Sequence, residues 1–167
     1  MDNKSLYILA GYDDDTEKVL SGIQNRLYES GFDGFQTKNI PMHFTLGSYG
    51  TGREEELMER LQKTAEEQKA FEVSFTHIGL FRLPANDVLF IAPEVNKEVL
   101  RLKDRFSDNK DQFTWSAHTT MLIDKPEKIL DAMPIVMDEF KGFSGRVEKL
   151  YLYEFWPTRH IMTVQLK

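Results

Sequence analysis

The chain contains no cysteine, and this absence excludes several kinds of chemistry at once. Disulfide bonds, thiolate metal sites and cysteine nucleophiles cannot occur in this sequence. Long hydrophobic runs are also missing, because no stretch approaches the ~20 apolar residues that a membrane-spanning helix requires. The first residues lead into a short strand-like segment and lack the apolar core of a secretory signal. We therefore expect a cytoplasmic protein without a membrane partner.

An excess of positive charge is missing as well. The net charge is −6, with 21 Lys and Arg residues against 27 Asp and Glu residues. Proteins that bind long nucleic acid duplexes rely on phosphate contacts from Lys and Arg. The net negative charge therefore argues against a long duplex nucleic acid as partner. A small nucleotide phosphodiester or an RNA terminus suits the sequence better.

The order of predicted elements repeats once along the chain. In the first half we expect strands at 6–10, around His43 and at 71–81, with helices that start near 13 and 53. In the second half we expect strands at 88–92, around His118 and at 146–155, with helices that start near 95 and 125, and a last strand at 160–166. The two histidines lie 75 residues apart, and the aromatic ends of the two long strands, Phe81 and Phe155, lie 74 apart. An internal duplication explains both spacings.

A duplication of this kind predicts an α+β fold in which antiparallel sheets are backed by helices. We expect a single bilobed domain over residues 1–167, with approximate lobes at 1–83 and 88–167 related by a pseudo-twofold axis. No low-complexity linker separates the halves, so the lobes should pack as one unit. We expect this unit to be a monomer.

Each half carries a histidine followed two residues later by a threonine, inside a strand-like run. The first motif is His43-x-Thr45 and the second is His118-x-Thr120. Side chains at i and i+2 of a strand point to the same face, so each motif presents an imidazole beside a hydroxyl. The alternate residues are apolar and should pack on helices; in the second motif we expect this set to include Ile123. A pseudo-twofold axis would bring the two histidines together across one cleft.

Two opposed imidazoles are suited to chemistry at a phosphodiester. A neutral histidine takes a proton from the attacking water or hydroxyl, and a protonated one donates to the leaving oxygen. The hydroxyls of Thr45 and Thr120 can bind the non-bridging oxygens, where negative charge accumulates. This scheme needs no metal and no cofactor, and two histidines without nearby carboxylates are a poor metal site.

With these paired motifs on a duplicated α+β chain, the sequence resembles the 2H phosphoesterase superfamily, which includes bacterial 2′-5′ RNA ligases and RNA cyclic phosphodiesterases. The resemblance implies a bilobed fold with both histidines in a central cleft. It also implies a metal-independent reaction at 2′,3′-cyclic or 2′-5′ linkages of a nucleotide or RNA end. In cyclic-ester hydrolysis it implies that His43 is the acid and His118 the base, with the roles exchanged in the reverse reaction.

The sequence departs from the RNA-directed members at one place and leaves alternatives open. Many of those members have an arginine soon after the second motif, where this chain has Leu122-Ile123-Asp124. A small cyclic nucleotide or an ADP-ribose-type ester therefore becomes a candidate substrate. A non-catalytic module that binds nucleotides or RNA ends is the alternative function, and a metal hydrolase is a third.

Three aromatic residues lie near the ends of the long strands, Phe81, Tyr153 and Phe155, and we take Phe81 and Tyr153 as candidate substrate-binding residues. Each could stack on a base, although each could equally belong to the core. His77 and His160 lack a threonine at the same spacing, and we expect them to be structural or to lie on the surface.

Overall fold

In the computed structural model of the chain, residues 4–34, 36–108 and 115–167 are described. In chain order their elements are β1 (Ser5–Tyr12), α1 (Asp14–Glu29), β2 (His43–Tyr49), the short 3-10 helix η1 (Thr51–Arg53), α2 (Glu54–Glu67), β3 (Phe71–Arg82), β4 (Asp87–Pro93), α3 (Lys97–Asp104), β5 (Thr119–Asp124), α4 (Pro126–Glu139), β6 (Phe143–Phe155) and β7 (Arg159–Gln165). None of the helices in these ranges is long and apolar enough to cross a membrane.

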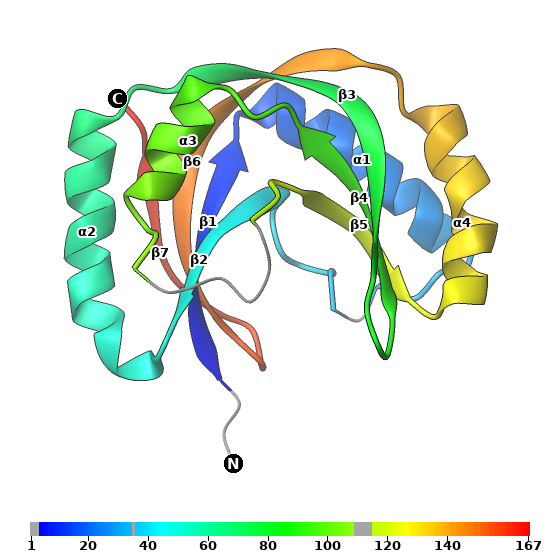
Figure 1. The fold of residues 1–167 in the computed structure, drawn as a ribbon, viewed down its shortest axis with the longest axis horizontal. Helices are drawn as coiled ribbons and strands as arrows, with labels where there is room; N and C mark the ends of the chain where they lie inside the picture. Colours follow the sequence, from blue (N-terminus) through cyan, green and yellow to red (C-terminus); the bar gives the residue numbers. More distant parts are fainter. Residues whose placement is uncertain (1–3, 35, 109–114) are drawn as a thin grey trace.

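The strands of the described residues form a seven-stranded antiparallel sheet in the order β2-β1-β6-β3-β4-β5, with β7 paired to β6. This order reads the same from both ends when β1 is exchanged with β4, β2 with β5 and β3 with β6. The α+β fold and its pseudo-twofold duplication are therefore confirmed. Figure 1 shows the two arms of the sheet, with α2 and α3 beside one arm and α1 and α4 beside the other.

The long strands are exchanged between the two halves of the sequence. The short turn at 83–86 folds β3 back onto β4, the first strand of the second half, and β6 returns to pair with β1. One spatial lobe thus contains β1, β2, β6 and β7 with α2 and α3, and the other contains β3, β4 and β5 with α1 and α4. The division at 1–83 and 88–167 describes the sequence repeat, whereas each spatial lobe contains elements from both halves.

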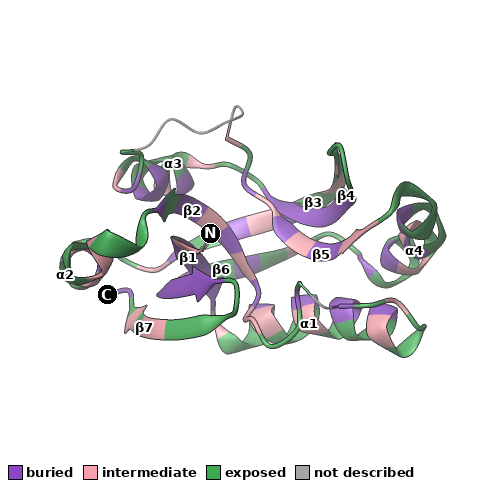
Figure 2. Ribbon diagram, turned by 90° about the horizontal axis from the view of Figure 1, so that it is seen from below, coloured by how far each residue is buried: buried purple, intermediate pink, exposed green. Residues whose placement is uncertain are grey.

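A large apolar core joins the two lobes, and a smaller cluster of Leu9, Tyr151, Tyr153 and Phe155 is separate from it. Buried side chains from both halves form one contiguous cluster between the sheet and the helices; Figure 2 shows much of the burial on the strands and on the inner sides of the helices. The first strand contributes Leu6, Ile8 and Ala10, and α1 contributes Leu20, Ile23 and Leu27 at helical spacing. The opposite face of the sheet is therefore left to form the cleft.

Helix starts follow the local sequence. Asp13 caps α1 by accepting a hydrogen bond from the Thr16 amide, and acidic residues fill the first turn, where the helix dipole favours them. Asn96 caps α3 in the same way through the Val99 amide. Equivalent caps on the first helix of each half add local support for the duplication.

Candidate functional site

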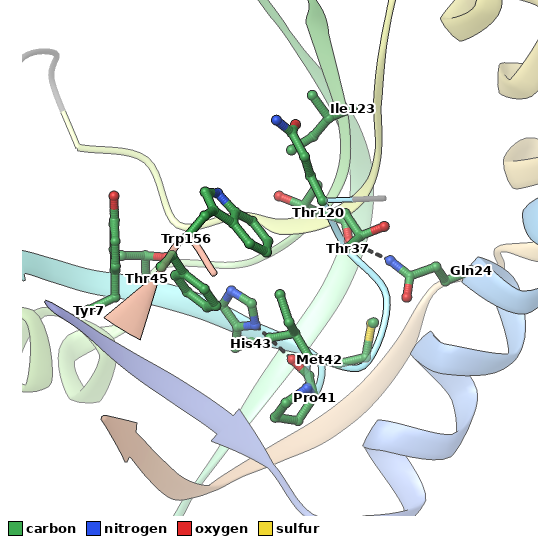
Figure 3. A pocket seen from close by; sticks show the side chains of 13 residues that line it. Tyr7, Gln24, Thr37, Pro41, Met42, His43, Thr45, Thr120, Ile123 and Trp156 are labelled. Carbon is green, nitrogen blue, oxygen red and sulfur yellow. Dashed lines mark hydrogen bonds between the residues drawn. The ribbon is translucent and has the colours of Figure 1, made fainter. Parts of the chain in front are cut away.

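His43 stands at the first position of β2, opposite Gly11 of β1. Its neighbours Met42 and Phe44 are buried in the core, which turns the imidazole to the opposite face of the sheet. The Nδ1 atom of His43 lies 2.7 Å from the backbone carbonyl oxygen of Pro41. Figure 3 shows this contact and the ring among the side chains that line the cleft.

His118 lies one residue before β5 and has the same local geometry. Its Nδ1 atom lies 2.8 Å from the backbone carbonyl oxygen of Ser116, again two residues earlier in the chain. The ring packs against two aromatic neighbours that also contact each other, with the Phe81 centroid at 4.8 Å and the Phe90 centroid at 5.4 Å. Gly79 makes room for this cluster, because a Cβ atom there would lie 2.1 Å from the Phe90 ring.

The two contacts fix the tautomer of each histidine. A carbonyl oxygen only accepts hydrogen bonds, so Nδ1 donates in both rings and carries a hydrogen. Nε2 of each ring has no hydrogen bond to the residues that the structure describes, and in the neutral ring it is the basic nitrogen. Both imidazoles can therefore take up or release a proton at Nε2 without rotating.

The surroundings of both histidines favour the neutral ring in the unliganded protein. Burial lowers the pKa of His43 to about 4; the bond to Pro41 opposes this shift, and the electrostatic effect of His118 adds to it. Burial also lowers the pKa of His118, while its bond to Ser116 acts in the opposite direction.

The two threonines accompany their histidines, and a β-bulge follows each of them. In β2, Thr45 and Gly47 pair with consecutive residues of β1, so Leu46 has no partner in the ladder. In β5, Thr120 and Leu122 pair with consecutive residues of β4, so Met121 has none. One residue of each motif strand, Leu46 or Met121, is therefore extra in the ladder. Both of these residues are buried.

The second bulge corrects one prediction of strand facing. The alternation of the sequence predicts Ile123 on the core side with Met121, and this prediction is wrong. After the bulge the alternation of β5 shifts by one residue, so that Leu122 is buried and Ile123 lines the cleft beside Thr120. The equivalent position after the first bulge is Ser48, which also lines the cleft. A uniform period of two cannot reveal an inserted residue.

The cleft consists of two chambers that share Tyr7 and Thr45. The first chamber has a volume of about 210 Å³ and contains His43 and Thr120; the second has a volume of about 610 Å³ and contains His118. The lining of the first chamber is Tyr7, Gln24, Gln36, Thr37, Ile40, Pro41, Met42, His43, Thr45, Thr120, Ile123, Phe155 and Trp156. That of the second chamber is Tyr7, Thr45, Leu46, Gly47, Ser48, Leu80, Phe81, Arg82, Leu83, Val88, Trp115, Ser116 and His118.

The structure thus brings the paired motifs and Phe81 to one cleft, but it places Tyr153 elsewhere. Tyr153 is buried, stacks on Phe155 at a centroid distance of 5.6 Å, and lines neither chamber. Its position in the ladder is nevertheless equivalent to that of Phe81: it pairs with Tyr7, as Phe81 pairs with Val88. In the first chamber, Phe155 rather than Tyr153 supplies the aromatic lining from β6.

Sequence reasoning missed several cleft residues because they lie outside the two motifs. Tyr7 comes from β1, Gln24 from α1, and Trp156 from the turn that precedes β7. Trp115 precedes the second motif and donates through Nε1 to the backbone oxygen of Thr45, at 3.0 Å. This bond joins the segment before one motif to the strand of the other.

The histidines outside the motifs lie on the surface. His77 and His160 are exposed and line neither chamber. No group of three or more His, Asp or Glu side chains in the described ranges is arranged to hold a metal ion.

Comparison with known proteins gives one family and several solved structures. The profile of the family described as the 2′-5′ RNA ligase superfamily matches residues 13–155. TT0787 of Thermus thermophilus is 13% identical, with a TM-score of 0.64 and coverage of 97% of both chains. Escherichia coli LigT in complex with 3′-AMP is 11% identical, with a TM-score of 0.58 and coverage of 98% of both chains. Kluyveromyces marxianus Usb1 with uridine monophosphate is 14% identical, with a TM-score of 0.51 and coverage of 98% of this chain and 99% of that one.

At these identities the solved structures support the fold alone. A comparison with curated proteins finds no match to the chain. The family match covers most of the sequence, including both histidine motifs.

Proposed function

Because the chain belongs to the 2′-5′ RNA ligase superfamily, we propose that it is a metal-independent phosphodiesterase acting by two-histidine acid–base catalysis. Its substrate is a 2′,3′-cyclic or 2′-5′ phosphodiester of a nucleotide or an RNA end. One observation carries the proposal: His43 and His118 are held by equivalent carbonyl contacts and line two pockets that share Tyr7 and Thr45. The equivalence of the two contacts supports a shared role for the two rings.

The reaction follows from the two free Nε2 atoms. In hydrolysis of a cyclic diester, the base removes a proton from water as the water oxygen bonds to phosphorus. The bond from phosphorus to one ribose oxygen breaks, and the acid gives that oxygen a proton. The resemblance assigns the acid to His43 and the base to His118. Thr45 and Thr120 donate hydrogen bonds to the non-bridging oxygens.

The low pKa of His43 fits this role only when the substrate is present. A neutral imidazole cannot be the acid, so the bound phosphodiester must raise the pKa of His43 until the ring is protonated. Binding of the substrate anion would then prepare the acid, and His43 stays neutral in the unliganded cleft.

The lining of the cleft favours a small ligand. Among the described lining residues Arg82 is the one cation, and it is paired with Asp87 at 2.7 Å. A long strand held by its phosphates would need a row of cations. Phe81, Phe155 and Trp156 offer apolar faces on which a base can stack. These features support small nucleotide diesters or single RNA termini as substrates. A monomeric, cytoplasmic enzyme remains part of the proposal.

A direct test uses a panel of 2′,3′-cyclic nucleotides, 2′-5′-linked dinucleotides and ADP-ribose cyclic phosphate, with and without a metal chelator. Substituting alanine for His43 or His118 should lower kcat on the order of 10²-fold or more. The matched control is His160→Ala, since His160 is exposed and lies outside the cleft. Full turnover by either motif variant would reject the two-histidine mechanism.

The same panel separates the alternatives. Binding of nucleotides without turnover would favour the non-catalytic module, for which the scarcity of cations in the described cleft lining is the supporting observation. Activity that the chelator abolishes would favour a metal hydrolase.

A further inference from the structure

The outer half of β3, residues 76–82, has a free edge. β6 pairs with β3 over residues 71–75, so the outer half pairs with β4 alone among the strands that the structure describes. The N–H and C=O groups on its other edge are therefore open to a further strand. Lys and Pro, which often protect such edges, are absent from residues 76–82.

The duplication shows what lies at the equivalent edge of the other lobe. The register that equates Phe81 with Tyr153 also equates Leu80 of β3 with Leu152 of β6. In β6 this stretch pairs with β7, where Met162 lies opposite Leu152. Leu152 is 0% exposed, whereas Leu80 is 36% exposed. In one lobe β7 thus occupies the place that stays open beside β3 in the other; Figure 1 shows β7 beside β6.

A matching β-bulge supports this correspondence. Thr76 is the extra residue in the pairing of β3 with β4, and Glu148 is the extra residue in the pairing of β6 with β1. The backbone oxygen of Glu148 accepts a hydrogen bond from the Leu166 amide at 2.8 Å, just after β7 ends. A strand added to β3 in the same way would place an amide at the backbone oxygen of Thr76.

The helix beside the open edge presents apolar side chains to solvent. α4 packs on β4 and β5, whereas its counterpart α2 packs on β6 and β7. Between α4 and the outer half of β3 lie two adjoining pockets of about 420 and 530 Å³ that share Leu80 and Met133, and we call them the β3–α4 groove. Leu130 and Met137 of α4 also line this groove, and they are 70% and 60% exposed. Clustered apolar exposure of this kind marks an interaction site.

The groove fits a separate extended segment better than a second copy of the chain. β6 occupies the same edge of β3 at residues 71–75. A copy that paired through its own β3 would therefore bring its β6 against the turn at 83–86. A single segment that pairs with residues 76–82 meets no such obstacle.

The charges along the groove give such a segment a direction. Glu127 lines the end of the groove near Arg82, and Lys141 lines the end near Thr76. A segment antiparallel to β3 begins near Glu127 and ends near Lys141. A carboxylate at its C-terminal end would therefore complement the lysine.

We propose that the β3–α4 groove binds an extended segment of another protein by strand addition, antiparallel to the outer half of β3. The segment resembles β7 and the residue after it, where Met162, Val164 and Leu166 are apolar at every second position. It carries a carboxylate at its C-terminal end. Main-chain hydrogen bonds to the free edge supply affinity, and the alternate apolar side chains pack beside α4. The inference goes beyond the proposed function and does not depend on it.

The probe is a synthetic peptide of residues 158–166, acetylated at its N-terminus and with a free C-terminal carboxylate. Binding to the full chain is measured by calorimetry, and hydrogen exchange of the backbone amides is followed by NMR. The peptide should slow exchange about tenfold or more at alternate amides of residues 76–82, because these amides become hydrogen-bonded. A scrambled peptide of the same composition is the control and should leave their exchange unchanged.

One substitution tests the contribution of α4. Met137→Lys places a charge in the groove and should weaken peptide binding about tenfold, because the methionine can no longer be buried against the peptide. The matched control is Leu100→Lys, since Leu100 is an exposed apolar residue of α3 outside the groove. This control should keep the affinity within about twofold of the wild-type value.

Two N-methylated peptides test the backbone pairing without any change to the protein. Each carries N-methyl groups at alternate residues, so that the amides of one edge or of the other are blocked. Methylation of the edge that faces β3 should abolish binding, whereas methylation of the opposite edge should preserve it.

Several results would overturn the proposal. Unchanged exchange at residues 76–82 with saturating peptide would do so, as would equal affinities of the two methylated peptides or full affinity in Met137→Lys. A wild-type dimer that Met137→Lys converts to a monomer in sedimentation would identify the occupant as a second copy and would also refute it. None of these measurements involves turnover, so this proposal and the proposed function can fail separately.

Discussion

A bound phosphodiester should raise the pKa of His43 from about 4 to near neutrality. One negative charge about 4 Å from the ring stabilises the imidazolium by about 4 kcal/mol at an effective dielectric constant of about 20. At about 1.4 kcal/mol for each pKa unit, this corresponds to a rise of about three units. His43 would then be substantially protonated at pH 7 when the cleft is occupied.

The measurement uses the variant His118→Gln, which should not turn the diester over and in which His43 is the remaining histidine of the pair. Histidine Cε1 proton signals are followed by NMR against pH, with and without a 2′-5′-linked dinucleotide. By linkage, a pKa that rises on binding requires affinity to increase as pH falls between the bound and free pKa values, by up to about tenfold for each pH unit. Calorimetry between pH 5 and 7 measures this increase independently.

The control adds His43→Gln to the same variant and should abolish the pH dependence, because glutamine does not titrate. The reasoning would be refuted by an unchanged His43 titration in the presence of saturating dinucleotide. It would equally be refuted by an affinity that stays constant from pH 7 to pH 5, since both results follow from the same equilibrium.

Two further predictions concern the surroundings of the site. Gly79→Ala should push Phe90 out of position, lower the free energy of unfolding by about 1–3 kcal/mol and reduce activity. Gly22→Ala should stabilise α1 slightly, because a Cβ atom there meets no other atom within 4 Å. Thermal unfolding and kcat are measured for both variants. Hydrogen bonds from Arg60 and Arg53 lower the pKa of Asp108 from 3.8 to about 2, so the stability from this carboxylate is present above pH 4 and is lost as pH falls through 2. Asp108→Asn should therefore flatten the loss of unfolding free energy between pH 4 and pH 2, as measured by denaturant titration.

The sequence was informative about the site because its pattern is local. A period of two places His43 beside Thr45 and His118 beside Thr120, and the repeat of elements predicts the α+β duplication. Local periodicity carries no information about which distant strand becomes a neighbour, so the exchange of β3 and β6 between the halves could not be read from it.

Two buried polar residues were hidden for a different reason. Gln24 and Lys103 look like ordinary polar residues on amphipathic helices, yet each donates to the backbone at a β-bulge, and the residue types do not predict a bulge. Aligning the apolar positions of α1 with those of α3 would have paired the two residues. The sequence left two roles open for Tyr153, base stacking or core packing, and its burial agrees with core packing.

The exchange of the long strands has a consequence for how the cleft behaves. The first residues of β6 run beside those of β3, so the sheet continues without interruption from one wall to the other. A hinge at this point would have to break backbone hydrogen bonds of the ladder. The separation of the two imidazoles is therefore established when the chain folds, and a substrate is accommodated by its own size and shape rather than by domain closure.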